Sequence, residues 1–150
     1  MHTSLVVLLV LVLAGFIVWK NMDLRTPAQK QADLDKLETQ ASAGEEEAQY
    51  KLLMLYYSDK DAKYWPIAFK WALAVAQKGE DPGVMLQLGE MYENGHGTAK
   101  DLQQALTWYE RALSADTALG ANSPLSKDGH LYLEQRVITL RQELAKSNPS

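Results

Sequence analysis

The sequence predicts an all-α fold: a short solenoid of antiparallel helix pairs, preceded by one transmembrane helix. Three observations support this prediction. A charge-free apolar run lies near the N-terminus, apolar residues recur every three or four positions through the rest of the chain, and one two-helix pattern occurs twice. Helix pairs of such a stack bury their apolar faces only against one another.

The composition fits one folded domain and excludes several classes of function. Of the 150 residues, 47% are hydrophobic, and the net charge is only −4. Basic and acidic residues are interspersed, which argues against nucleic-acid binding. The chain has no cysteine, so it holds no disulfide, thiolate metal site, cysteine nucleophile or lipid-modified N-terminal cysteine.

Residues 1–20 are expected to form an N-terminal membrane anchor. The run from Thr3 to Trp19 carries no charge, and its length is at the short end of what spans a hydrocarbon core of about 30 Å. Trp19 and Lys20 are placed as interfacial anchors. The competing interpretation is a secretory signal cleaved before Gly15. We favour a retained anchor, because cleavage there would leave the apolar residues 16–19 exposed at the mature end.

The flanking charges predict how the chain is oriented in the membrane. The basic side chains nearest the span all follow it: Lys20, Arg25, Lys30 and Lys36. The positive-inside rule therefore places the rest of the chain in the cytoplasm. We expect a single-pass protein of the inner (cytoplasmic) membrane with cytoplasmic repeats. Interleaved aspartates weaken the asymmetry and leave a periplasmic orientation open.

After the anchor, the sequence predicts a linker with one helix and then two helix pairs. Residues 21–43 form the linker and a helix that begins at Pro27 and carries Leu34 and Leu37. Residues 44–115 hold the two pairs. In the first pair, Pro66 suits the first turn of the second helix and Gly79 suits its end.

The second pair repeats the spacing of the first. Aligned positions are Ala48, Leu52 and Tyr56 with Val84, Leu88 and Tyr92, and Ala68, Trp71 and Val75 with Ala105, Trp108 and Ala112. A period in the mid-thirties made of two antiparallel helices is typical of tetratricopeptide-like solenoids.

The second repeat, LGEMYENGHGTAKDLQQALTWYERAL, resembles the Sel-1-like repeat (SLR), a relative of the tetratricopeptide repeat. The pattern LGxxYxxGxGxxxDxxxAxxWYxxAA is matched by Leu88, Gly89, Tyr92, Gly95, Gly97, Asp101, Ala105, Trp108, Tyr109 and Ala112. The first repeat is a degenerate copy with Leu53 in place of the first glycine and no GxG. The resemblance implies an interaction scaffold rather than a catalyst.

The loop NGHGTAKD is expected to be a structural repeat turn. Gly95 and Gly97 allow the left-handed backbone of a tight reversal, and Asp101 stands where a helix N-cap belongs. A phosphate loop would follow a strand and carry GK[ST], which this loop does not. His96 has no Ser, Cys or paired carboxylate at a recognisable spacing. We therefore expect no catalytic, cofactor-binding or metal-binding residues, and we expect the chain not to be an enzyme.

Residues 116–150 are expected to form a loop, a C-terminal capping helix and a frayed tail. The run KDGHLYLEQRVITLRQELAK carries Leu131, Val137, Ile138 and Leu144 at roughly helical spacing. This helix would close the end of the stack.

A second apolar stripe on the first repeat is the predicted partner-binding surface. Tyr50, Met54 and Tyr57 recur at i, i+4 and i+7, apart from the stripe that packs the repeat. Equivalent positions in the second repeat include Glu90 and Glu93, so a groove would run from aromatic to acidic. The competing interpretation is that the helix of residues 27–43 covers this stripe through its leucines.

These features predict a membrane-anchored protein-binding scaffold or adaptor for assembly or regulation of a membrane or envelope protein. Its expected partners are one unidentified protein and the membrane, without nucleic acid, small-molecule substrate or cofactor. An alternative is a small single-pass accessory subunit of a larger membrane complex. The Ala14-Gly15 pair would then be the close-packing site of the membrane helix.

Overall fold

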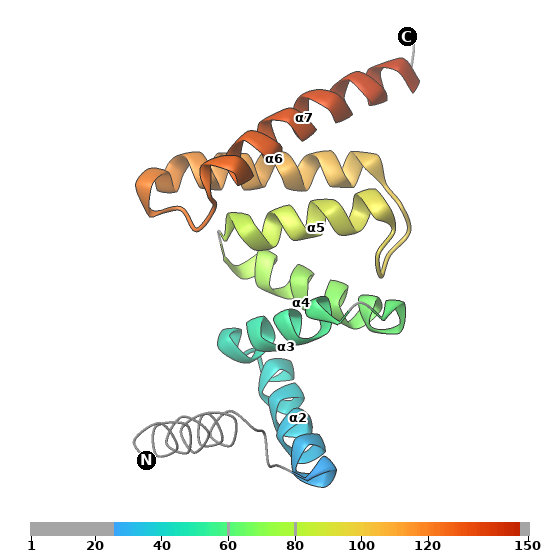
Figure 1. Cartoon of the computed structure of the whole chain (residues 1–150), viewed down its shortest axis with the longest axis vertical. Coiled ribbons are helices and arrows are strands. Elements are labelled where there is room, and N and C mark those ends of the chain that lie inside the picture. Colours follow the sequence, from blue (N-terminus) through green and yellow to red (C-terminus); the bar gives the residue numbers. More distant parts are fainter. Residues whose placement is uncertain (1–25, 60, 80, 148–150) are drawn as a thin grey trace, which may run out of the picture. The chain divides into compact units, whose positions relative to one another are not determined.

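All regular structure in the described part of the chain is helical, which confirms the all-α prediction (Figure 1). The computed structural model describes residues 26–59, 61–79 and 81–147. The predicted membrane anchor at residues 1–20 therefore lies outside the described residues, and so does the end of the predicted tail. Within the described segments, no helix combines the length and the apolar character needed to cross a membrane.

The chain divides into two compact units, residues 1–35 and residues 36–150. Helix α2, Pro27–Ser42, begins in the first unit and ends in the second. The second unit then continues through α3 (Glu46–Ser58), the 3₁₀ turn η1 (Ala62–Tyr64), α4 (Trp65–Lys78), α5 (Pro82–Asn94), α6 (Leu102–Leu119), η2 (Gly120–Asn122) and α7 (Lys127–Ser147).

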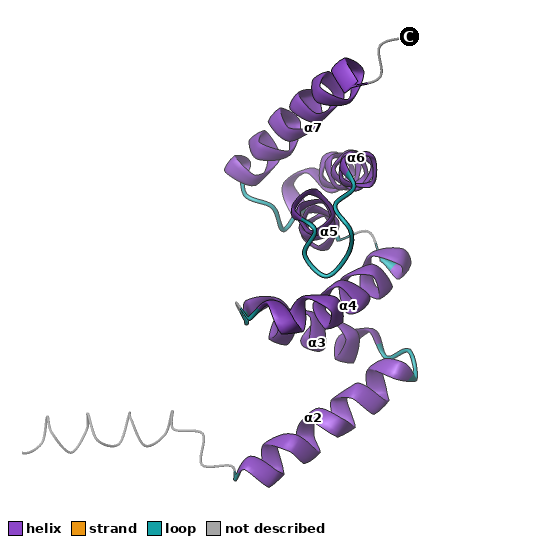
Figure 2. Ribbon diagram, turned by 90° about the vertical axis from the view of Figure 1, so that its right-hand side faces the viewer, coloured by secondary structure: helices purple, strands orange, loops and turns teal. Residues whose placement is uncertain are grey.

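Helices α3 to α7 pack in chain order, each against the next. Figure 2 shows α5 and α6 side by side, nearly end on, with α7 beyond them. Four of the six aligned pairs are buried alike: Ala48 and Val84, Leu52 and Leu88, Ala68 and Ala105, Trp71 and Trp108. In the other two pairs Tyr56 and Ala112 are buried, whereas their counterparts Tyr92 and Val75 are half-buried. The repetition seen in the sequence is therefore also a repetition of core positions.

The predicted repeat turn ends α5 and starts α6. Gly95 has a φ of 75°, and its N–H donates to the carbonyl oxygen of Met91, which closes the last turn of α5. Asp101 caps α6, because its Oδ1 accepts the backbone N–H groups of Gln103 and Gln104, both at 2.9 Å.

The same turn also joins the two repeats. Figure 2 shows the loop between α5 and α6 extending toward α4. At Gly97, where φ is 77°, an added Cβ would collide with the carbonyl of Trp65 and lie 2.9 Å from the nitrogen of Pro66. The imidazole of His96 stacks on the Trp65 ring, with centroids 3.8 Å apart. His96 thus has a packing role that the sequence did not indicate.

The two repeats exchange a small and a large residue at equivalent core positions. A Cβ on Gly89 would lie 2.9 Å from Cζ of Tyr109 and closer still to other atoms of that ring, so the tyrosine fills the space beside the glycine. In the first repeat the aligned residues are Leu53 and Ala72, both fully buried. The degenerate copy therefore keeps the combined volume of the pair while reversing which helix supplies the bulk.

The C-terminal helix begins where the sequence predicts, but of its four predicted apolar residues only Val137 is buried. Leu133, Val137 and Leu140 are buried against the stack, whereas Leu131 is 51% exposed and Ile138 is 56% exposed. The reason is angular: positions 133, 137 and 140 follow one helical stripe, and positions 131 and 138 lie on another. Helix α6 also extends past the predicted repeat boundary at 115, to Leu119.

We predict that Gly97→Ala destabilises the protein more than Gly120→Ala does. Both glycines have positive φ, so both substitutions should cost about 1–3 kcal/mol in backbone strain. Only Gly97 also meets backbone atoms of another repeat, since nothing lies within 4 Å of a Cβ at Gly120. Urea denaturation of the two variants measures the difference. Equal losses would show that the turn needs glycine for its conformation alone.

We also predict that Gly89→Leu and Tyr109→Ala compensate each other. Gly89→Leu alone should cost about 1–3 kcal/mol or more by overpacking against the Tyr109 ring, and Tyr109→Ala alone should leave a cavity. Together they reproduce the arrangement of the first repeat. A double-mutant cycle in urea should show the double variant more stable than the sum of the singles by about 1 kcal/mol or more. Simple additivity would contradict the exchange.

Candidate protein-binding face

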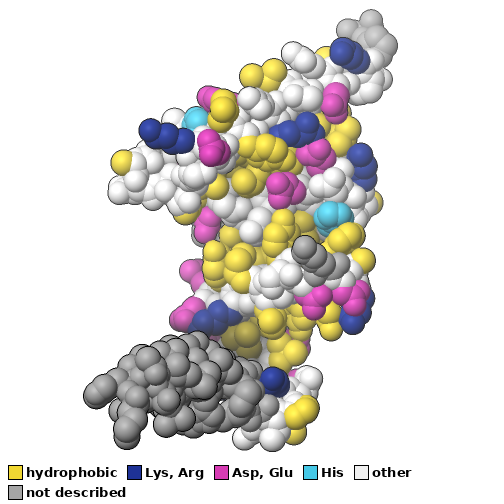
Figure 3. Space-filling view, viewed as in Figure 1, with side chains coloured by type: hydrophobic (Ala, Val, Ile, Leu, Met, Phe, Trp, Pro, Cys, Tyr) yellow, Lys and Arg dark blue, Asp and Glu magenta, His cyan; other side chains and the backbone are white. Residues whose placement is uncertain are grey.

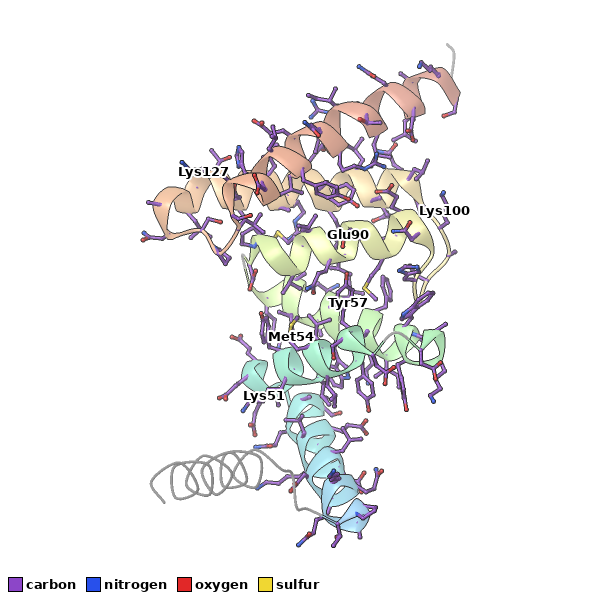
Figure 4. The ribbon with its side chains drawn as sticks, viewed as in Figure 1. Lys51, Met54, Tyr57, Glu90, Lys100 and Lys127 are labelled. Carbon is purple, nitrogen blue, oxygen red and sulfur yellow. The ribbon has the colours of Figure 1, made fainter. Side chains whose placement is uncertain are left out.

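Side-chain contacts join α3 to α5, which together form one row of predicted binding residues, and they also join α5 to α7. The hydroxyl of Tyr57 on α3 donates to Oε2 of Glu90 on α5 at 3.1 Å. One turn further along α5, Glu93 accepts hydrogen bonds from Arg136 on α7. Figure 4 shows Tyr57 and Met54 on α3 with Glu90 on α5 above them. The predicted residues Tyr57, Glu90 and Glu93 therefore lie on this row.

Glu93 is fully engaged within the molecule. Its Oε2 accepts from the Tyr109 hydroxyl at 2.8 Å, and Arg136 forms an ion pair with its Oε1. The two charged side chains are only 20% and 23% exposed. Burial, together with the hydrogen bond to Glu93, raises the pKa of Tyr109. Glu93 thus holds α5, α6 and α7 together and is not free to receive a partner.

Glu90 lies one turn away in a different environment. Among the described residues, no Lys or Arg lies within ion-pair distance of it, and its carboxylate accepts a hydrogen bond from the Tyr57 hydroxyl. Burial raises the pKa of Glu90, and the nearby charge of Glu93 adds to the rise, against hydrogen bonds from Tyr57 and Tyr132 and a favourable interaction with His96. Burial and the same carboxylate raise the pKa of Tyr57 to about 12. Glu90 is thus a partly buried carboxylate without an ion pair to Lys or Arg among the described residues.

Tyr50 and Met54 extend the apolar part of this face along α3. Tyr50 is 42% exposed and lines a cavity of about 360 Å³ between α3 and α4. Charged and small residues complete its lining: Glu46, Glu47, Val75, Lys78, Gly79 and Asp81. Met54 is half-buried between Tyr50 and Tyr57. On the side drawn in Figure 3, hydrophobic side chains gather over α3 to α5 with acidic ones among them.

The part of α2 that belongs to the second unit packs on another side of α3. Gln49 Nε2 donates to the carbonyl oxygen of Ala41 at 2.9 Å, and the Tyr56 hydroxyl donates to Glu38 Oε1 at 2.9 Å. These contacts use Gln49 and Tyr56, not the Tyr50 stripe. Residues 36–42 therefore leave Tyr50 exposed.

A cluster of Ser123, Asp116 and His130 joins the end of α6 to the start of α7. The Ser123 hydroxyl donates to Asp116 Oδ1, and His130 Nδ1 contacts Asp116 Oδ2. Although burial of Asp116 favours its neutral form, these two hydrogen bonds hold its pKa below the ordinary value. The hydrogen bond to Asp116 raises the pKa of His130.

This cluster has the residue types of a catalytic triad without its geometry. In a triad the histidine accepts the serine proton and the carboxylate orients the histidine. Here Ser123 bonds directly to Asp116, and His130 Nε2 faces Glu134 Oε1 at 3.5 Å. The cluster links the end of α6 to the start of α7 through hydrogen bonds.

The sequence analysis did not identify this cluster, nor the role of Arg136, because no local spacing rule connects residues that meet only after folding. In the described segments, no group of three His, Asp or Glu side chains could hold a metal ion.

Part of the chain is similar to part of a known protein. No protein-family profile matches the chain. The chitin synthase regulator SKT5 of Saccharomyces cerevisiae is similar to it, with 38% identity over 64 residues. Those residues are 43% of this chain and 9% of the yeast protein. The matched stretch is thus less than a tenth of that relative's length.

We predict that Glu90→Gln stabilises the protein at pH 7. Because the folded-state pKa of Glu90 is raised, the folded protein binds this proton more tightly than the unfolded chain, and the free energy of unfolding falls as pH rises through that range. Glutamine removes this loss. The melting temperature of the variant should exceed the parent's at pH 7, and the gain should shrink as the pH is lowered toward 4.

Glu143→Gln on the exposed side of α7 is the matched control. This substitution removes the same charge at a position outside the row. Its melting temperature should therefore not show a gain over the parent at pH 7 that disappears at acid pH. A melting temperature of Glu90→Gln below the parent's at pH 7 would contradict the prediction, because it would show that the Glu90 carboxylate stabilises the folded protein.

Proposed function

We propose that this protein is a membrane-anchored Sel-1-like-repeat scaffold that binds a segment of a partner protein on the row formed by α3 and α5. The partner would be a membrane or envelope protein, for whose assembly or regulation the chain acts as adaptor. Thr3–Trp19 would hold the chain in the inner membrane with the repeats in the cytoplasm. The apolar sequence of that segment and the basic residues after it support this part of the proposal.

The observation that carries the binding site is the environment of Glu90. A carboxylate whose pKa is raised by burial, with no cation within ion-pair distance in the described chain, lowers stability where it stands. A Lys or Arg side chain of a partner would supply the missing charge. Apolar partner residues would then lie on Met54 and Tyr50 along α3, since methionine and tyrosine adapt well to varied ligands.

The repeat architecture supports binding rather than catalysis. Solenoids present rigidly spaced side chains on an extended face. The serine, histidine and aspartate that meet at the α6–α7 junction lack the geometry for nucleophile activation. A partial similarity to a protein named as a regulator is compatible with a binding role. Since it covers 9% of that protein, we propose no action on chitin synthase for this chain.

We predict that changes on this row release the partner without unfolding the protein. The full chain, carrying a C-terminal tag, is purified from solubilised membranes, and bound proteins are quantified by mass spectrometry. Glu90→Gln and the double variant Tyr50→Ala/Met54→Ala should each lose most of the partner retained by the parent. Gln135→Ala, an exposed change on α7, is the control and should retain it.

Melting temperatures make the result decisive. Loss of the partner in Glu90→Gln, despite unchanged or higher stability, can only reflect the missing charge at the interface. Retention of the partner by both variants at the parent's level would contradict the proposed face. Recovery of a large assembly that does not exchange with free chain would instead favour the accessory-subunit role.

A further inference from the structure

Helix α7 carries an apolar stripe that nothing in the described part of the second unit covers. Leu131 and Ile138 are more than half exposed, and Ala145 continues the line seven residues on, also exposed. Between them stand Glu134 and Arg141, so the stripe repeats with the alternating three- and four-residue steps of a helix-pairing seam. It is distinct from the face of Leu133, Val137 and Leu140, which packs on the stack.

The stripe borders an open groove between α6 and α7. The groove has a volume of about 660 Å³. Its apolar lining includes Leu113 and Ala118 from α6 and Val137 and Ile138 from α7. Charged residues line it as well: Glu110, Glu134 and Arg141. Its shape and lining suit an amphipathic helix lying alongside α7. The apolar face of such a helix would pack on the apolar lining, and its polar flanks would meet the charged residues at the edges of the groove.

The charges of the stripe are self-complementary about a two-fold axis. If two copies of α7 run antiparallel and cross beside Ile138, each Ile138 meets its counterpart. Glu134 lies four positions before Ile138 and Arg141 three after it, so Glu134 of one copy stands level with Arg141 of the other to within about one residue rise, 1.5 Å. Leu131 stands level with Ala145 in the same way. Every apolar residue meets an apolar residue, and every charge meets its opposite.

The existing contacts of the two charged residues are compatible with this pairing. Arg141 Nη2 donates to Glu110 Oε1 at 2.7 Å, with the arginine side chain 63% exposed. Glu134 Oε1 lies 3.5 Å from His130 Nε2 and is about half exposed. An exposed ion pair holds its members only weakly, so both residues keep atoms and freedom for a second partner.

We propose that the chain forms a homodimer in which α7 pairs antiparallel with α7 of a second copy, each helix lying in the α6–α7 groove of the other. This interface is isologous, as the commonest symmetric dimers are. It does not depend on the partner-binding row, because that row uses α3 and α5.

Cross-linking of the full chain in membranes tests the proposal. The chain has no cysteine, so each introduced thiol reports on one position. Ile138→Cys places two thiols at the two-fold axis, whereas Gln135→Cys, also exposed on α7, places them away from it. Proximity raises the effective concentration of the paired thiols to the millimolar range, so a short bis-maleimide should link Ile138→Cys at least about tenfold faster than Gln135→Cys.

Charge exchange identifies the pairing. In the Ile138→Cys chain, Glu134→Arg and Arg141→Glu should each abolish most of the cross-linked homodimer, because like charges then face each other across the axis. The two changes together restore opposite charges and should restore the homodimer. This recovery separates pairing from misfolding, since a variant that fails to fold is not rescued by a second charge reversal.

Three outcomes would overturn the proposal. Equal cross-linking of Gln135→Cys would show random collision in the membrane. Failure of the double exchange to recover the dimer would exclude the antiparallel register. Cross-linking of Ile138→Cys to a different protein in place of itself would show that the stripe belongs to another partner.

Discussion

At Gly97 the loop between α5 and α6 lies against the backbone at the start of α4, and this contact, together with the packing of α5 on α4, holds the second repeat on the first. A side chain at Gly97 would collide with Trp65, and the His96 ring stacks beside the same point. Position 97 therefore requires glycine for two reasons, the positive φ of its backbone and the close contact with Trp65. Helix α5 ends at this loop and α6 begins after it. The contact of the loop with α4 therefore also helps to place Glu90 beside the Tyr57 hydroxyl.

Two glutamates one turn apart on α5 show how the surroundings decide what a carboxylate does. Glu93 is bonded to Tyr109 and Arg136 and connects three helices. Glu90 meets a tyrosine hydroxyl and feels the repulsion of Glu93. The first stabilises the stack, because a buried charge with its partner in place is compensated. The second should lower stability at neutral pH, because burial raises its pKa, and such a group is a reasonable place to expect function.

Sequence reasoning succeeded where structure is determined locally. The end of α5 at Gly95 and the start of α6 after Asp101 follow from glycine conformation and from capping, which involve neighbours in the chain. It did not find the Glu93–Arg136 pair, because residues 43 positions apart meet only when α7 is docked. Nor did it find which stripe of α7 is buried, since both stripes have helical spacing and only the rotation of the docked helix distinguishes them.

That rotation gives α7 two separate tasks. One stripe closes the stack, and the other presents Leu131 and Ile138 to the outside. A terminal helix of a solenoid normally turns a polar face outward, since nothing further covers it. An apolar outer stripe therefore implies a neighbour, and a self-complementary one implies a second copy. The proposed membrane anchor would bring two chains together at a high effective concentration, so even a weak helix pair would join them. Such a pair would carry two copies of the Tyr57–Glu90 row, and a partner with two basic segments would then be held more tightly than either row could hold it alone.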